Sequence, residues 1–239
     1  MPEHAMRPMP EDWERAVAVV AHPDDLEYGA ASAVARWTGQ GKHVSYVLAS
    51  RGEAGIAGMD PAVVAPLRVD EELRGAALVG VSDVAFLDHV DGLIEYGLPL
   101  RRDLAAAFRR LRPDVVLTMS FDLTWGEDGP VNHADHRAVG LAVLDACRDA
   151  ANEWVFTDAG PRCDTIRDAY VIATGNPTHF VDVTDTIDAG VASLREHQAY
   201  IDGLGTDFDP DEFLRNMAGF TGLGAGVDYA VGMRRYPMG

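Results

Sequence analysis

An apolar run that ends in a histidine, a proline and two acids opens the patterned part of the chain: Val17-Ala18-Val19-Val20-Ala21-His22-Pro23-Asp24-Asp25. The length and β-branched content of the run are typical of a buried strand. In open α/β sheets ligands bind outside the carboxyl ends of the strands, which is where this polar cluster falls. Two adjacent carboxylates repel each other unless water, a metal or a partner compensates them. The stretch therefore predicts an α/β sheet with one half of a metal site at the end of a strand.

The rest of the chain alternates between strand-like and helix-like segments. Strands are expected at 17–20, 43–50, 84–87, 114–119, 154–156, 170–173 and 179–183, and helices at 26–40, 66–79, 99–111, 132–150 and 184–200. Such alternation predicts a Rossmann-like, doubly wound α/β fold with a mostly parallel sheet. We expect one domain over residues 1–239, with its core at about 16–200 and an irregular C-terminal third. The Gly-rich tail 203–239 is expected to contribute to the rim of the pocket.

The composition restricts the partners of the protein. Its 239 residues include 20 basic and 38 acidic ones, and the net charge of −18 argues against binding to nucleic acid or anionic membranes. No apolar run approaches the roughly 20 residues needed to span a bilayer, and no signal region opens the chain. We therefore expect a cytoplasmic protein whose partner is a small molecule, with homo-oligomerisation left open. The two cysteines, Cys147 and Cys163, lack metal-type spacing, and no disulfide is expected.

A second polar cluster lies far away in sequence, at the start of the helix expected over 132–150. In the common strand order 3-2-1-4-5, the first and fourth strands are neighbours at the topological switch point. That order brings His22 and Asp25 next to His133 and His136, which are three apart and lie on nearly the same helix face. Three nitrogen and oxygen ligands with one open position suit a catalytic zinc ion.

Together, His22-Pro23-Asp24-Asp25 and His133-Ala134-Asp135-His136 closely resemble the LmbE-like, or PIG-L, family of zinc-dependent N-deacetylases. Supporting matches lie after the second expected strand, in the helix that follows it and further along the chain. They are Arg51-Gly52-Glu53-Ala54-Gly55, Arg68 with Glu71, residues 87–92, Val181-Asp182 and His197-Gln198. Two positions depart from the family pattern, namely Ala31-Ser32, where two glycines are usual, and Tyr229-Ala230-Val231-Gly232, which lacks an acid.

The resemblance implies roles for six residues and one zinc ion per subunit. His22, Asp25 and His136 would bind the metal, and Asp24 would be the general base. His133 would stabilise the oxyanion or protonate the leaving amine, and Asp135 would orient His133. Local sequence offers a simpler alternative for some of them: Asp24 and Asp25 as acids at a helix N-terminus, and Asn132 with Asp135 as a helix cap.

Four further residues are candidate substrate contacts, and each has a structural alternative: Arg51 (an ion pair with Glu53 or Asp91), Asp91 (a turn), His197 (a packed helix residue) and Trp125 (a packing residue). Family members hydrolyse acetamides of amino sugars or amide bonds of mycothiol-type thiol conjugates. The expected function is therefore removal of an acetyl group from an N-acetylated amino sugar or a related small acetamide. A thiol-conjugate amidase and a degenerate, non-catalytic binding protein are the alternatives, while a receiver-like module would leave His133 and His136 unexplained.

Overall fold

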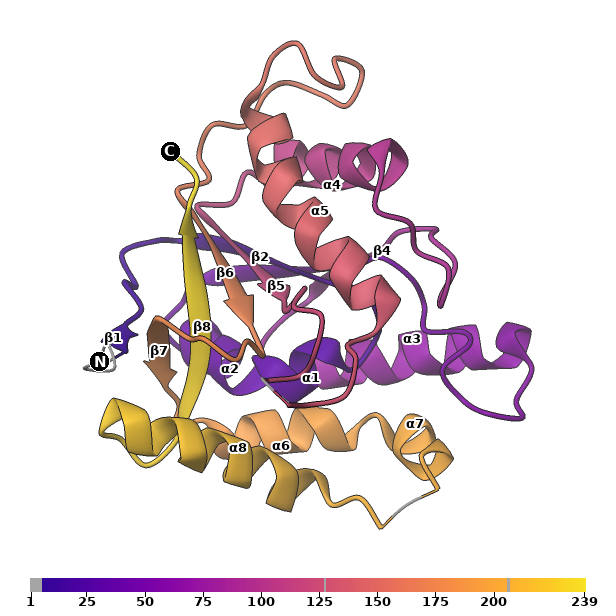
Figure 1. Cartoon of the computed structure of the whole chain (residues 1–239), viewed down its shortest axis with the longest axis vertical. Coiled ribbons are helices and arrows are strands. Elements are labelled where there is room, and N and C mark those ends of the chain that lie inside the picture. The colour runs from indigo at the N-terminus through magenta and orange to yellow at the C-terminus, as the bar shows by residue number, and fades with distance from the viewer. Residues whose placement is uncertain (1–5, 127, 206) are drawn as a thin grey trace.

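A mixed sheet lies at the centre of the computed structural model, which describes residues 6–126, 128–205 and 207–239 (Figure 1). In these residues the sheet has eight strands in the order β1-β7-β8-β6-β5-β2-β3-β4. The strands are β1 (Arg7–Pro8), β2 (Arg15–Val20), β3 (His43–Leu48), β4 (Asp83–Phe86), β5 (Val115–Met119), β6 (Asp168–Ile172), β7 (His179–Asp182) and β8 (Ala230–Pro237). The helices are α1 (Asp25–Gly29), α2 (Ala31–Gly39), α3 (Pro61–Leu78), α4 (Leu98–Leu111), α5 (Ala134–Ala151), α6 (Ile187–Arg195), α7 (Gln198–Gly203) and α8 (Pro210–Ala225).

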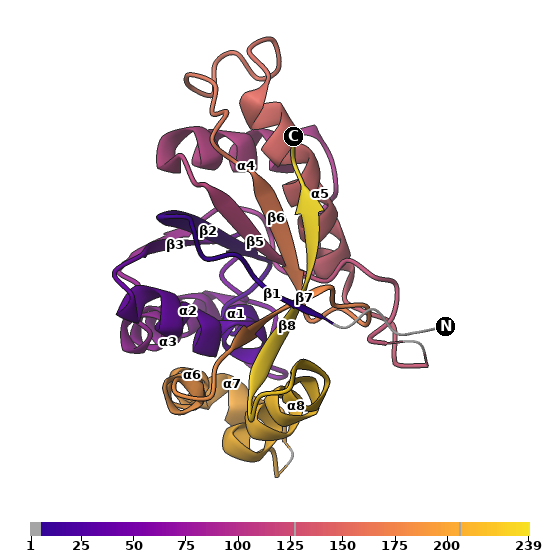
Figure 2. The ribbon, with the colours of Figure 1, turned by 90° about the vertical axis from the view of Figure 1, so that its left-hand side faces the viewer.

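The predicted α/β class and the predicted central strand order are confirmed. Strand β2 pairs in parallel with β3 on one side and with β5 on the other, so that the first and fourth expected strands are neighbours. Helices α4 and α5 cover one face of the sheet, and α1, α2 and α3 cover the other (Figure 2). This doubly wound arrangement leaves the carboxyl ends of β2 and β5 side by side at the switch point, which is where a ligand site is expected.

Two helices differ from their predicted bounds. The helix expected over 26–40 is interrupted at Ala30, whose φ of −145° separates α1 from α2. Helix α3 begins at Pro61 rather than at Pro66, because the Asp60 side chain accepts the Ala62 N–H at 2.9 Å and Pro61 occupies the first turn. Pro66 therefore lies inside α3 and does not start it.

The strand expected at 154–156 is wrong. Arg109 of α4 donates to the carbonyl oxygens of Asn152, Val155, Phe156 and Gly160, and its side chain is buried. These carbonyls converge on one guanidinium and are unavailable to a neighbouring strand, and Phe156 has a φ of 50°. The segment is apolar but forms a loop, because its carbonyl groups bind an arginine some 45 residues away in sequence.

The tail 203–239, of which residue 206 lies outside the described part, is regular rather than irregular. Helix α8 begins where the Asp209 side chain accepts the Asp211 N–H, and it ends at Gly226, whose φ of 77° favours glycine. Strand β8 then inserts antiparallel between β6 and β7, as Figure 1 shows. A sheet position between two strands of the core is decided by long-range pairing, which the local sequence does not reveal.

Two further expectations concern compartment and membranes. Cys147 and Cys163 are both buried free thiols. In the described part of the chain, none of the helices combines the length and apolar character that a bilayer span requires.

Candidate active site

The turn between β2 and α1 supplies the first half of the site. Asp25 is the first residue of α1, and its Oδ2 accepts the backbone N–H groups of Ala21 at 3.1 Å and His22 at 2.8 Å. Asp24 has a φ of 88°, a left-handed conformation that costs a non-glycine residue on the order of 1–3 kcal/mol. Oδ2 of Asp25 thus closes the turn, and Oδ1 remains available for contacts outside the turn.

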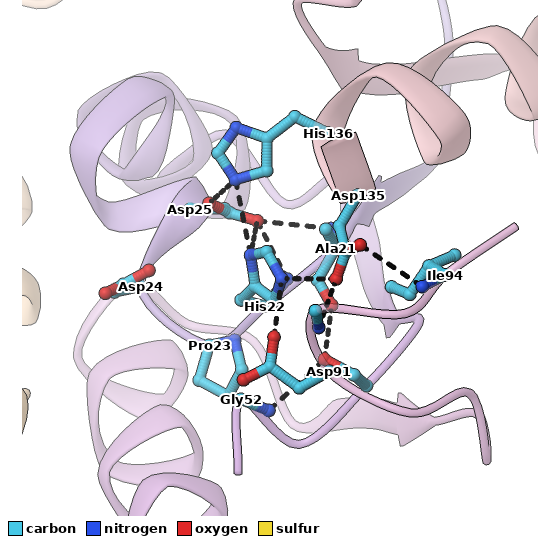
Figure 3. Close-up of polar contacts among 12 residues, drawn as sticks. Ala21, His22, Pro23, Asp24, Asp25, Gly52, Asp91, Ile94, Asp135 and His136 are labelled. Carbon is cyan, nitrogen blue, oxygen red and sulfur yellow. Dashed lines mark hydrogen bonds and ion pairs between the residues drawn. The ribbon is translucent and has the colours of Figure 1, made fainter. Parts of the chain in front are cut away.

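The start of α5 supplies the second half. Because β5 lies next to β2, the residues that follow the two strands meet, although about 110 positions separate them in sequence. His136 Nε2 lies 3.2 Å from His22 Nδ1 and 3.2 Å from Asp25 Oδ1, and His22 Nδ1 lies 3.6 Å from Asp25 Oδ2 (Figure 3). These three side chains form a group that could hold a metal ion.

The remaining ring nitrogens are hydrogen-bonded in a way that suits metal ligands. His22 Nε2 lies 2.9 Å from Asp91 Oδ1 and 3.1 Å from Asp135 Oδ2, so that its N–H donates there and Nδ1 keeps a lone pair. His136 Nδ1 lies 3.0 Å from Asn132 Oδ1, which assigns its N–H to that position and leaves a lone pair on Nε2. Such outer partners fix the tautomer and ring orientation of metal-binding histidines.

The electrostatics of the group favour a bound cation. Burial disfavours the charged form of His22, but hydrogen bonds to Asp135 and Asp91 and the charge of Asp25 outweigh it and raise the pKa of His22 to about 10. Burial likewise opposes ionisation of Asp25, but His136 and His22 outweigh it and lower the pKa of Asp25 to about 2. A buried group that stabilises positive charge on His22 will also stabilise a metal ion bound there.

Two other groups of side chains have ligand-type spacing in the described residues: His22 with Asp91 and Asp135, and Glu27 with Glu72 and His197. In the first group the distances of 2.9 and 3.1 Å are those of hydrogen bonds to His22. The second group is enclosed, because all three side chains are at most 1% exposed. A catalytic metal needs an open position. His22, Asp25 and His136 all line a cavity, whereas Glu72 and His197 do not belong to its described lining, so the first three are the better candidate.

Asp24 lines the same cavity but turns its carboxylate away from the three metal-site side chains (Figure 3). The carboxylate pairs with the buried Arg68 guanidinium, with Oδ2 3.0 Å from Nη2, and the Asp24 N–H donates to Glu72 at 3.2 Å. Burial raises the pKa of Asp24 well above its usual range, although Arg68 opposes this rise. Arg68 also lies over the Tyr200 ring, 4.4 Å from its centroid, so that α3 and α7 together fix the orientation of Asp24.

His133 is exposed to the cavity and stacks on His136, with ring centroids 4.8 Å apart. Burial and the neighbouring His136 and His22 lower the pKa of His133. Asp135, which the family resemblance implied would orient His133, instead accepts the Gly92 N–H at 2.7 Å and the Ile94 N–H at 3.2 Å, besides contacting His22. It therefore ties the loop after β4 to His22.

The capping alternative for Asn132 and Asp135 is not what the structure shows. His133 is the N-cap residue of α5, and within the described chain its side chain makes no capping bond. Asn132 instead donates from Nδ2 to the carbonyl oxygens of Ser120 and Asp122 and accepts from His136. Its position four residues before His136 is the signal by which this role could have been recognised.

The four candidate substrate residues divide into two pairs. Asp91 and Trp125 line the cavity, and the Trp125 ring meets His136 edge-on with centroids 5.6 Å apart. Arg51 and His197 are absent from the described cavity lining. Arg51 pairs with Asp88 at 3.0 Å, and its backbone N–H donates to Glu53. His197 is fully buried against Glu27 and Glu72, and burial lowers its pKa to about 3.

The cavity itself has a volume of about 1080 Å³ and lies between the metal-site residues and α8. Besides the site residues, it is lined by apolar side chains of α1, β6 and α8, among them Tyr28, Ile172, Met217 and Phe220. The tail thus forms part of the cavity wall.

Comparison with known proteins places this geometry in a family. A diacetylchitobiose deacetylase of Thermococcus kodakarensis is 27% identical over 95% of this chain and 84% of its own length. A 1D-myo-inositol 2-acetamido-2-deoxy-alpha-D-glucopyranoside deacetylase of Kineococcus radiotolerans is 28% identical over 78% of this chain and 69% of its own. The N,N'-diacetylchitobiose deacetylase structure from Pyrococcus horikoshii superposes with a TM-score of 0.85 at 24% identity, covering 95% of this chain and 85% of that one.

The family model described as PIG-L, GlcNAc-PI de-N-acetylase, matches residues 17–147, which contain both halves of the metal site. Since this match spans more than half of the 239 residues, the chain belongs to the PIG-L family.

Proposed function

We propose that this protein is a zinc-dependent hydrolase that removes the acetyl group from an N-acetylated amino sugar. The observation that carries the proposal is the convergence of His22 Nδ1, Asp25 Oδ1 and His136 Nε2, with the other nitrogen of each ring already hydrogen-bonded. Two imidazoles and one carboxylate, with an open side toward a cavity, are the donor set of a catalytic zinc site. Zinc bound there would polarise the acetamide carbonyl and lower the pKa of water to about 7.

The protein's own residues would handle the protons. Asp24 lines the cavity next to Asp25, and its carboxylate, which pairs with Arg68 in this structure, would turn toward the site to take a proton from the attacking water. His133 is exposed to the same cavity on the far side of His136, where it would donate to the oxyanion or to the leaving nitrogen. Asp91 and Asp135 would keep His22 in position while these transfers occur.

The substrate class rests on the relatives, whose printed names describe deacetylases of diacetylchitobiose and of an acetamido-glucopyranoside of inositol. Trp125, edge-on to His136 and in the cavity, is the side chain we expect to contact the sugar ring. A mycothiol-type conjugate amidase would use the same metal chemistry and is the alternative substrate class. A degenerate binding protein is disfavoured because every metal and proton-transfer position is filled.

The test combines metal content with acetate release. The wild type should bind one zinc ion per chain and release acetate from N,N'-diacetylchitobiose or an N-acetylglucosaminyl-inositol, and it should act on a bimane-labelled thiol conjugate more slowly. His136→Ala should lose the metal, whereas the matched control His43→Ala, at an exposed position at the start of β3, should keep both metal and activity. Zinc-loaded protein that releases no acetate from either acetamido sugar would contradict the proposal.

A further inference from the structure

A stripe of three large apolar side chains on α8 forms one wall of the cavity. Phe213, Met217 and Phe220 are spaced i, i+4 and i+7, so that they share one helix face, and all three line the cavity. Met217 is 55% exposed and Phe220 is 79% exposed. Large apolar side chains that remain exposed together are typical of binding surfaces rather than of ordinary protein surface.

Of the stripe, only Phe213 packs against the domain, whereas Met217 and Phe220 are exposed and do not hold α8 in place. The adjacent helix face does so through Leu214 and Ala218, which are buried in a cluster with Ile187, Val191 and Leu194 of α6. Because α8 is already anchored by that face, the exposure of Met217 and Phe220 has no packing explanation. The stripe also lies outside residues 17–147, the part that matches the family model, and so it is a feature of this chain's C-terminal third.

The apolar stripe is continuous with the catalytic turn. Tyr28 follows Asp25 by three residues, and its ring meets Phe213 edge-on with centroids 5.5 Å apart. Ile172 of β6, Pro177 and Val231 of β8 add further apolar lining to the same cavity. An apolar path therefore leads from the metal-site residues along α8 to the rim at Phe220.

The charge of the cavity restricts what this path can bind. Among the described lining residues Arg68 is the only lysine or arginine, and its guanidinium is already paired with Asp24. A phosphate or sulfate on the distal part of a substrate would meet no free cation there, whereas an uncharged apolar group would meet Phe213, Met217 and Phe220. The cavity volume of about 1080 Å³ lies at the upper end of the range for ligand pockets, which is roughly 300–1,000 Å³.

We propose that the apolar stripe on α8 binds an uncharged alkyl or aryl group attached to the acetamido sugar, so that the substrate is an amphipathic glycoside rather than a free sugar. The inference rests on the proposed deacetylase function. Phe220 lies seven positions after Phe213, so the stripe extends about 10 Å along the helix at about 1.5 Å per residue, which is about the length of an eight-carbon chain. We favour this occupant over a second copy of the chain because the stripe lines the same cavity as His22 and Asp25.

The experiment compares the methyl, butyl and octyl β-glycosides of N-acetylglucosamine, with the octyl compound below its critical micelle concentration. Each fully buried methylene strengthens binding about fourfold (about 0.8 kcal/mol), and partial burial at a rim gives less. We therefore expect KM to fall at least about tenfold from the methyl to the octyl glycoside, with kcat little changed. The double variant Met217→Ser/Phe220→Ser should bring the octyl-to-methyl ratio of kcat/KM close to one.

The matched control is Leu223→Ser on the same helix. Leu223 is 84% exposed but does not belong to the described cavity lining, so the octyl preference should persist in this variant. A KM that is independent of chain length, or an equal loss of preference in Leu223→Ser, would overturn the proposal. So would an oligomer that dissociates in the double variant, since the stripe would then be a subunit interface.

Calorimetry of octyl and methyl β-glucoside binding separates this inference from the proposed function, because it needs no turnover. Tighter binding of octyl β-glucoside, combined with no acetate release from the N-acetylglucosaminides, would refute the deacetylase but keep the apolar subsite. Acetate release with equal affinity for the two glucosides would refute the subsite alone.

Discussion

Replacement of Asn132 by alanine removes three hydrogen bonds that connect two loops to a metal ligand. Nδ2 donates to the carbonyl oxygens of Ser120 at 2.9 Å and Asp122 at 3.1 Å, and Oδ1 lies 3.0 Å from His136 Nδ1. Asn132 is only 2% exposed, so water does not replace these partners without rearrangement. At about 1 kcal/mol for each bond, the variant should lose about 3 kcal/mol of stability.

The metal affinity should fall separately. Without Asn132 Oδ1 the His136 ring is free to rotate and to exchange its proton between the two nitrogens. Loss of such an outer partner typically weakens metal binding about 10- to 100-fold, which is about 1.4–2.8 kcal/mol. Urea unfolding of the metal-free protein measures the first effect, and competition for zinc with a chromophoric chelator measures the second.

Asn132→Asp separates the two effects. It keeps an oxygen acceptor for the His136 N–H but loses both donations to Ser120 and Asp122, so stability should still fall while zinc affinity recovers. The matched control is Asn152→Ala at the other end of α5, where the side chain of an exposed asparagine accepts only the Trp154 N–H in the described structure. If Asn132→Ala lost stability but bound zinc as tightly as the wild type, Asn132 would be a purely structural residue and our assignment would be refuted.

Three further outcomes are expected. Asp24→Asn, which keeps an acceptor for Arg68, should retain zinc but lower kcat about 10²- to 10⁴-fold, as is typical of a lost general base; unchanged kcat would remove Asp24 from the mechanism. His22→Ala should lose stoichiometric zinc in metal analysis, and a fully loaded variant would show that His22 is not a ligand. His197, with its pKa lowered to about 3, takes up a proton only on unfolding, so it costs stability as the pH falls below about 6.5, on the order of 2 kcal/mol by pH 5. His197→Gln should flatten the pH dependence of urea unfolding in that window, whereas replacement of the exposed His43 should not; equal curves for all three proteins would contradict the buried, neutral assignment of His197.

The sequence by itself determined the fold class, and it indicated which residues form the candidate metal-binding group. An apolar β-branched run before His22-Pro23-Asp24-Asp25 specifies a buried strand, and the short spacings His22 to Asp25 and His133 to His136 are local enough to be recognised without a structure. The proximity of the two halves followed from a topological rule, which the pairing of β2 with β5 confirms.

Only the tertiary structure decided what the outer residues contact. Asp135 and Asn132 have the spacing of a helix cap, yet they contact His22 and His136, because the neighbouring loops occupy their remaining polar atoms. Arg51 and His197 match the family pattern but face Asp88 and a buried carboxylate pair.

The structure of the C-terminal third could not be predicted from the local sequence either. Helix α8 and strand β8 carry weak local patterns, and they become regular because β8 completes the hydrogen bonds of β6 and β7 while Leu214 and Ala218 bury one face of α8 against α6. Partners of this kind are chosen by packing between segments far apart in the chain. Local spacing therefore indicated the candidate metal-binding residues, whereas only long-range packing could specify the wall of the cavity that they line.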